Sequence, residues 1–265
     1  MSILELKNIN LVKDGGETLL ENVNLKAEPG DVILITGNNG TGKSTLFKAL
    51  LSFIGNEEDK YAGIEGEFIF DGVSKKKDLN SYIINIQQED YLSMPIYKAK
   101  TALKISLEKY KDQEKRFNDW LEKYLPLTKE DTKKGKDKNK KLIDKSIFEL
   151  SGGEQKYLSI LQGLVRCDDP EIKLVLIDEP TNNLDHIHIK HLSDLIQRIR
   201  HFRPDLAFII ISHCHVWPYI TKTYEIKKTD EKSNNTLIEV DNECHNCFGN
   251  ADEDGYYNSS MNPSK

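Results

Sequence analysis

The chain has 265 residues, of which 38% are hydrophobic and 30% charged, and its formal net charge is −6. It contains no apolar stretch of about 18 residues, which excludes a membrane-crossing helix, and its first residues do not resemble a secretory signal. The negative charge disfavours general nucleic-acid binding. We therefore expect a soluble cytoplasmic protein with no nucleic-acid partner, whose four cysteines are free thiols.

The first part of the chain has strand patterns separated by turns. Apolar residues alternate loosely over residues 3 to 11, 19 to 25 and 64 to 70, and Gly-containing turns lie between these stretches. This arrangement predicts an antiparallel piece of sheet. Between the second and third of these stretches, residues 32 to 35 form an apolar run that predicts a buried strand, and residues 46 to 51 have a helical pattern.

A glycine-rich loop lies between that strand and that helix, with the sequence Gly37-Asn38-Asn39-Gly40-Thr41-Gly42-Lys43-Ser44-Thr45. Its spacing fits G-x-x-x-x-G-K-[ST], in which backbone N–H groups surround phosphates and the helix N-terminus adds partial positive charge. We expect Lys43 to reach the β- and γ-phosphates and the Ser44 hydroxyl to bind Mg²⁺. By itself the loop predicts only that a nucleoside triphosphate binds.

The middle of the chain predicts a short strand followed by helices. Residues 82 to 86 form a buried strand that ends at Gln87-Gln88, and residues 97 to 125 have helical spacing. Thr128 to Lys141 is rich in lysine and predicts a solvated loop, with contact to the phosphates of a lipid surface or a nucleic acid as the alternative. A further helix, over residues 154 to 165, follows the glycine-rich turn Ser151-Gly152-Gly153.

Two more apolar strands end in polar residues. Residues 174 to 177 precede Asp178-Glu179, and residues 207 to 211 precede Ser212-His213, with a helical pattern over 187 to 200 between them. Alternating strands and helices predict an α/β fold with a mainly parallel central sheet, in which ligands bind at the carboxyl ends of the strands.

The polar residues at these strand ends suggest catalytic roles. Asp178 is placed to hold Mg²⁺, and Glu179 to orient or deprotonate an attacking water. His213 would contact the γ-phosphate, and the Gln88 amide oxygen would bind the metal or the water.

In this order, the motifs resemble those of the ATP-binding subunits of the ABC ATPase superfamily, over roughly residues 3 to 225. The matching motifs are Walker A at 37 to 45, the Q-loop at Gln88, the signature Leu150-Ser151-Gly152-Gly153-Glu154-Gln155, Walker B ending in Asp178, catalytic Glu179, the D-loop Asn183-Leu184-Asp185 and the switch residue His213. The resemblance implies a P-loop NTPase core, an N-terminal antiparallel β subdomain, and a helical subdomain over about 89 to 165 that carries the signature.

The resemblance also implies partners. Two ATP-binding subunits, identical or different, would pair head to tail around two ATP, with Ser151, Gly152, Gly153, Gln155 and Asp185 at the ATP of the partner. A separate integral-membrane permease would hold the protein at the inner face of the cell membrane and dock after Gln88. The candidate contacts for this permease are Glu89, Asp90, Tyr91, Leu92 and Met94.

We favour a small exporter of peptides or drugs, because the chain has no added C-terminal regulatory domain. The alternative is a soluble assembly scaffold of the iron–sulfur cluster type.

Three features have no counterpart in the family pattern. The aromatic residue that usually stacks on adenine would fall near Asp14, where Val12-Lys13-Asp14-Gly15 contains none. The lysine-rich loop, whose limits we place at residues 128 and 145, corresponds to none of the family motifs. We assign residues 1 to 228 to the ATPase domain and 229 to 265 to a weak strand and a polar, flexible tail. Cys244 and Cys247 in this tail form a C-x-x-C. We expect these cysteines to be part of a plain tail, with metal binding or redox chemistry as the alternative.

Overall fold

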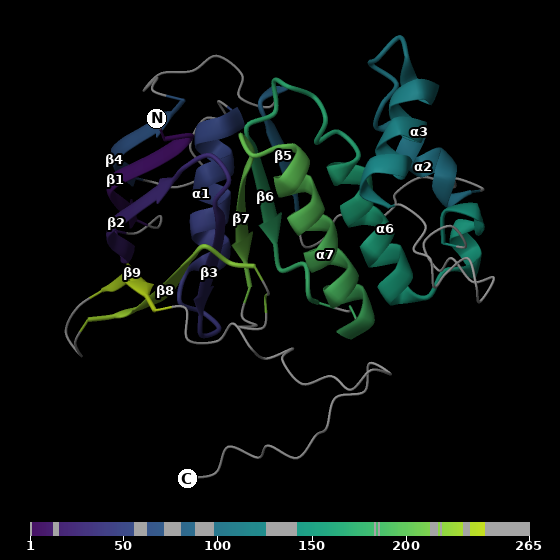
Figure 1. Ribbon diagram of the computed structural model, residues 1–265. Helices are drawn as coiled ribbons and strands as arrows, with labels where there is room; N and C mark the ends of the chain where they lie inside the picture. Colours follow the sequence, from purple (N-terminus) through teal and green to yellow (C-terminus); the bar gives the residue numbers. More distant parts are fainter. Residues whose placement is uncertain are drawn as a thin grey trace.

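The computed structural model describes residues 2–12, 16–55, 63–71, 81–87, 98–125, 142–182, 184, 186–212, 217, 219–229 and 234–241. The strands in these ranges form one sheet in the order β4-β1-β2-β9-β8-β3-β7-β6-β5 (Figure 1). The strands are β1 (Leu4–Val12), β2 (Thr18–Ala27), β3 (Val32–Gly37), β4 (Gly63–Phe70), β5 (Ile83–Ile86), β6 (Leu174–Asp178), β7 (Ala207–Ile211), β8 (Lys222–Lys228) and β9 (Asn235–Val240). The helices are α1 (Lys43–Gly55), α2 (Ala99–Ile105), α3 (Gln113–Tyr124), the 3₁₀ turn η2 (Ile147–Glu149), α6 (Gly152–Leu164) and α7 (His186–Phe202).

The centre of the sheet is parallel, as predicted. β8, β3, β7, β6 and β5 pair in parallel, and every residue of β3, β6 and β7 is buried. Strands that are covered on both faces read as continuous apolar runs, which is why the sequence identified these three. The predicted α/β fold class is therefore confirmed.

Alternate residues of the central strands face two separate cores. Ile33 and Ile35 pack with α1 and the N-terminal strands, whereas Val32 and Leu34 pack with the helices on the other face. Figure 1 shows the sheet curling around α1 on one side, with α7, α6, α3 and α2 on the other. The helical subdomain thus lies on the face of the sheet opposite to α1.

The predicted antiparallel piece is present and belongs to the same sheet as the core. β1 pairs antiparallel with both β2 and β4. β2 joins β9 through the pairing of Leu20 with Asn235. The N-terminal strands are therefore continuous with the central strands.

The sheet continues past residue 228, where the ATPase domain was predicted to end. β9 pairs antiparallel with β8 over residues 235 to 240 and lies between β8 and β2. Its Leu237 is 8% exposed and packs in the core around α1. The expected weak strand is therefore an internal strand, because it pairs with β8 along its length and with β2 at Asn235. We propose to extend the domain to at least Asp241.

The helical stretch predicted over residues 97 to 125 is divided into α2 and α3. Between them the chain turns, so that Leu107 is buried and the Tyr110 hydroxyl donates a hydrogen bond to Asp169, just after α6. These contacts with the end of α6 override the local helical pattern. None of the helices described is both long and apolar enough to span a bilayer.

Candidate active site

The candidate site lies where three neighbouring strands end. Ile35 of β3 pairs with Ile211 of β7, and Ile211 pairs with Asp178 of β6. β6 and β7 run toward the lower side of the sheet in Figure 1. The loop after β3 and the acidic pair after β6 therefore share one edge of the sheet, as the sequence predicted.

The loop after β3 requires glycine at defined positions. Gly37, Gly40 and Gly42 have φ angles of 149°, 80° and 109°, which residues other than glycine rarely adopt. A Cβ at Gly37 would lie 2.8 Å from the Ile226 carbonyl oxygen, and one at Gly42 would lie 3.2 Å from the Leu20 side chain. Strands β8 and β2 thus lie so close to the loop that they leave no room for a side chain at Gly37 and little at Gly42.

Lys43 is held inside this loop. Its side chain is buried, and its ammonium donates to the carbonyl oxygens of Gly37 at 2.8 Å and Asn38 at 3.1 Å. A phosphate would be a stronger acceptor than these carbonyl groups, because its hydrogen bond with an ammonium is charge-assisted on both sides. Asn38, Asn39, Gly40 and Ser44 are exposed, and Thr41 and Thr45 are partly buried.

Asp178 is a buried acid with an unsatisfied oxygen. It is 8% exposed, and none of the described residues donates a hydrogen bond to its Oδ1. Burial raises the pKa of its carboxyl to about 6, and the charge of Glu179 adds to this rise, while nearby lysines counteract it. A carboxylate oxygen that is buried without a donor fits a hard cation, since Mg²⁺ prefers oxygen ligands.

Glu179 adopts a backbone conformation that is uncommon for its residue type. Its φ is 45°, and its N–H donates to the Ile211 carbonyl oxygen at 2.7 Å. Such left-handed residues cost free energy and are frequent at functional sites. Glu179 is 6% exposed and Asp178 is 8% exposed, so the two adjacent acidic residues are both largely removed from bulk water.

The signature sequence forms the start of α6. The Ser151 hydroxyl accepts from the Glu154 N–H at 3.2 Å, and the Glu154 carboxylate accepts from the Ser151 N–H at 2.9 Å, which is a capping box. Ser151 and Gly152 are exposed, and a Cβ at Gly152 would meet nothing within 4 Å. The Gln155 amide donates to the Leu150 carbonyl oxygen at 3.2 Å. Within the described part of the chain, the N-terminus of α6 is therefore uncovered at Gly152.

Two residues near the site were not identified from the sequence. Lys156 is buried on α6, donates to the Gln87 carbonyl oxygen at 3.1 Å, and lowers the pKa of Asp178 through its charge. Asn235 on β9 donates to the Thr41 carbonyl oxygen at 3.1 Å. No local pattern identifies either contact, because a lysine in an amphipathic helix and an asparagine after a polar turn both read as solvent-facing.

Several predicted residues lie outside the described ranges. They are Gln88, the contact residues 89 to 94, residues 128 to 141 of the lysine-rich loop, Asn183, Asp185, His213, and the tail with Cys244 and Cys247. Their roles stay predictions. The rest of the lysine-rich loop predicted over 128 to 145 is described, and there the prediction is wrong, because residues 142 to 144 are helical and Leu142 and Ile143 are buried.

Comparison with known proteins identifies the family. The family model described as ABC transporter matches residues 20–182, which is more than half of the chain. The chain belongs to the ABC transporter family. The resemblance found in its motifs is thereby confirmed, and as an ABC ATPase the protein binds and hydrolyses ATP.

Individual relatives of this ABC ATPase agree with the match. The ABC transporter ATP-binding protein YclH of Bacillus subtilis is 28% identical over 222 residues, covering 80% of this chain and 88% of that protein. The phosphonates import ATP-binding protein PhnC of Staphylococcus saprophyticus is 28% identical over 224 residues, covering 81% and 80%. The structure of cbiO1 from Clostridium perfringens, part of the ABC transporter complex cbiONQ, matches the fold with a TM-score of 0.66 at 23% identity, covering 89% and 87%.

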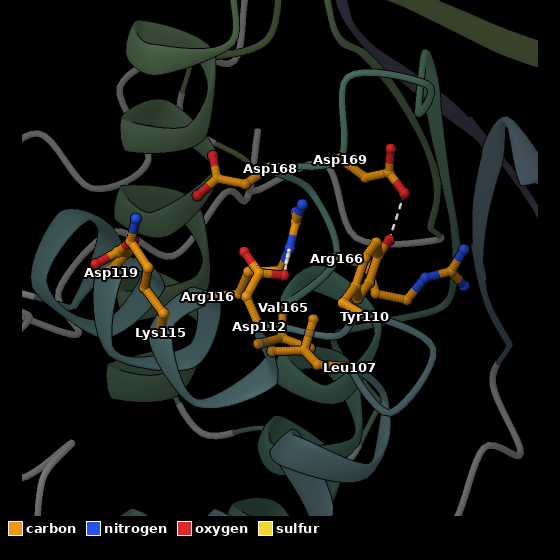
Figure 2. A pocket seen from close by; sticks show the side chains of 10 residues that line it. All are labelled: Leu107, Tyr110, Asp112, Lys115, Arg116, Asp119, Val165, Arg166, Asp168 and Asp169. Atoms are coloured by element: carbon orange, nitrogen blue, oxygen red, sulfur yellow. Dashed lines mark hydrogen bonds and ion pairs between the residues drawn. The ribbon is translucent and has the colours of Figure 1, made fainter.

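The ABC ATPase also has a hollow of about 230 Å³ between the α2–α3 turn, α3 and the end of α6. Figure 2 shows the Tyr110 hydroxyl pointing at Asp169 and Arg116 beside Asp112. These acids are thus satisfied by the chain's own donors, and none of the lining residues belongs to the loop over 37–45. We assign no ligand to this hollow.

Proposed function

We propose that this chain is the ATP-hydrolysing subunit of an ABC transporter and that the loop over 37–45 binds the phosphates of ATP. One observation carries the proposal. The loop shares an edge of the sheet with Asp178, whose buried Oδ1 has no donor among the described residues. A bound nucleotide with its cation would supply the missing partner.

The residues at this edge suit a magnesium ion. Ser44 and Asp178 would hold it, with Gln88 as the further oxygen ligand predicted from the sequence. Mg²⁺ held there would neutralise part of the negative charge of the phosphates. The ammonium of Lys43 would leave the carbonyl oxygens of Gly37 and Asn38 and bind the same phosphates.

Glu179 is the residue we assign to the attacking water. Its carboxylate follows β6 directly, and its backbone is fixed by the bond to Ile211. A buried carboxylate is suited to accept a proton from water or to orient it. His213 would contact the γ-phosphate from the end of the neighbouring strand.

The exposed start of α6 suits a second copy of an ATP-binding subunit. Ser151, Gly152 and Gly153, with Gln155 and Asp185, would contact the ATP held by the partner, where the helix N-terminus stabilises negative charge. The pairing would be head to tail, in a homodimer or a heterodimer. Loss of the γ-phosphate would remove these contacts, so hydrolysis would open the dimer.

A membrane-embedded permease is the second partner that we propose. A hollow of about 460 Å³ lies between β5, the end of α2 and α6. Its lining includes Ile84, Ile86 and Ile105, and also two polar atoms without partners among the described residues, Asn85 Oδ1 and Arg166 Nε. It borders β5 just before Gln88, where docking was expected. The relative cbiO1 is part of a transporter complex.

Import is the direction that we now favour. PhnC, which is similar over most of its length, is named for phosphonate import. No comparison supports the exporter that we favoured from the sequence, and none favours the iron–sulfur scaffold.

The experiment is an affinity capture from detergent-solubilised cells. Tagged Glu179→Gln protein with ATP and Mg²⁺ should bring down an integral-membrane protein, and the additional change Arg166→Glu should weaken this capture. Lys115→Glu is the matched control, because it makes the same charge change at an exposed residue outside the 460 Å³ hollow. Capture of soluble proteins alone would overturn the transporter assignment and would favour the alternative, a soluble assembly scaffold.

A further inference from the structure

Three chain segments that are distant in sequence meet beside the phosphate loop. Leu20 of β2 pairs with Asn235 of β9, and the Leu20 side chain lies over Gly42. The Asn235 amide donates to the Thr41 carbonyl oxygen at 3.1 Å. The neighbouring strand β8 presses its Ile226 carbonyl on Gly37. The C-terminal hairpin β8–β9 therefore forms one wall of the loop.

The Thr41 carbonyl that Asn235 contacts belongs to the same peptide group as the Gly42 N–H. The described chain has no cis peptide bond, and in a trans peptide the C=O and the N–H point in opposite directions. A carbonyl held toward Asn235 therefore turns the Gly42 N–H away from Asn235. None of the described residues accepts a hydrogen bond from this N–H.

We propose that Asn235 is a positioning residue of the phosphate loop, which holds the Thr41 carbonyl so that the Gly42 N–H is oriented to bind a phosphate of ATP. The inference rests on the proposal that residues 37–45 bind these phosphates. Asn235 lies beyond the segment 20–182 that the family model matches.

The surroundings keep the Asn235 side chain in place. Its backbone is part of two ladders, to Lys228 of β8 and to Leu20 of β2. The preceding residue, Asn234, donates to the Glu21 carboxylate at 3.0 Å and not to the loop. Substitutions at these two adjacent asparagines therefore distinguish support of the hairpin from contact with the phosphate loop. Asn234 supports the hairpin, and Asn235 contacts the loop.

The test compares Asn235→Ala and Asn235→Asp with the matched control Asn234→Ala. We expect Asn235→Ala to raise the KM for ATP and the Kd of a fluorescent ATP analogue by about two- to tenfold, the range for one hydrogen bond, with kcat nearly unchanged. Asn235→Asp should raise both further, because a carboxylate would face the carbonyl oxygen. Asn234→Ala should leave both constants unchanged, with a melting temperature close to that of Asn235→Ala.

The inference is overturned if Asn235→Ala and Asn234→Ala bind ATP equally well, or if both weaken binding in proportion to a loss of stability. Lys43→Ala distinguishes this outcome from failure of the proposed function. If Lys43→Ala binds ATP as tightly as the unchanged protein, the phosphate site itself is wrong. If Asn235→Ala does not fold, ATP binding by the isosteric variant Asn235→Asp is compared with that of Asn234→Ala instead.

Discussion

Asp178 is an acid that the ligand-free fold holds in an unfavourable environment. Its pKa is raised to about 6 by burial and by the charge of Glu179, from an unfolded value of about 3.9. A raised pKa means that the protonated form favours folding. The stabilisation is therefore complete below the unfolded pKa and is lost as the pH rises through about 6.

We predict from this that Asp178→Asn makes the ligand-free protein less sensitive to pH. The stability of the variant relative to the unchanged protein should increase by about 2–3 kcal/mol between about pH 4 and pH 7. Urea unfolding at several pH values measures the difference, and comparing the two pH values cancels any fixed effect of the amide. A constant difference over this range would show that the acid is not destabilised.

Glu179 should matter for the rate and not for binding. We expect Glu179→Gln to lower kcat by at least about 100-fold, the scale of a lost general base, and to change ATP affinity little. Steady-state hydrolysis and equilibrium binding measure the two effects. Glu171→Gln is the control, because Glu171 is an exposed acid on the turn before β6. Equal activity of both variants would contradict the role assigned to Glu179.

At the scale of single elements, α6 connects the signature to the sheet. Its N-terminus is capped by Ser151 and its far end packs on β5 at Gly163, where a Cβ would lie 2.7 Å from Ile86 Cγ1. We predict that Gly163→Val lowers the free energy of unfolding by about 2 kcal/mol, because overpacking outweighs the gain of about 0.4 kcal/mol in helix propensity when valine replaces glycine.

Urea unfolding checks this prediction. Gly152→Ala, on the same helix, should change stability by less than about 0.5 kcal/mol, since a Cβ there meets nothing within 4 Å. Equal losses for both variants would mean that Gly163 is not a point of close contact.

Elements with strong local patterns were predictable, and contacts between distant segments were not. β3, β6 and β7 are continuous apolar runs, and Ser151-Gly152-Gly153 followed by Glu154 is a recognisable helix start. The position of β9 between β8 and β2 depends on pairing between Leu20 and Asn235, which no local periodicity encodes. For the same reason Lys156 could not be assigned to the site from its helix pattern.

At the scale of the whole molecule, β9 closes the gap between the two parts of the sheet. We predict that a chain ending at Lys228 does not fold stably, because it exposes the edges of β8 and β2 and loses the burial of Leu237. A chain ending at Asp241 keeps every strand described and should melt near the temperature of the full chain. Thermal unfolding compares the two, and equal melting temperatures would show that β9 is dispensable.

We propose that ATP joins two subunits through the loop over 37–45 of one and the start of α6 of the other. The most direct measurement is the mass of Glu179→Gln protein in solution, by light scattering, with ATP and with ADP. We predict about twice 30.4 kDa with ATP and 30.4 kDa with ADP, and no dimer when Gly152→Asp is added, although ATP still binds. A single mass of 30.4 kDa at saturating ATP, or an ATP-dependent dimer that survives Gly152→Asp, would contradict the account.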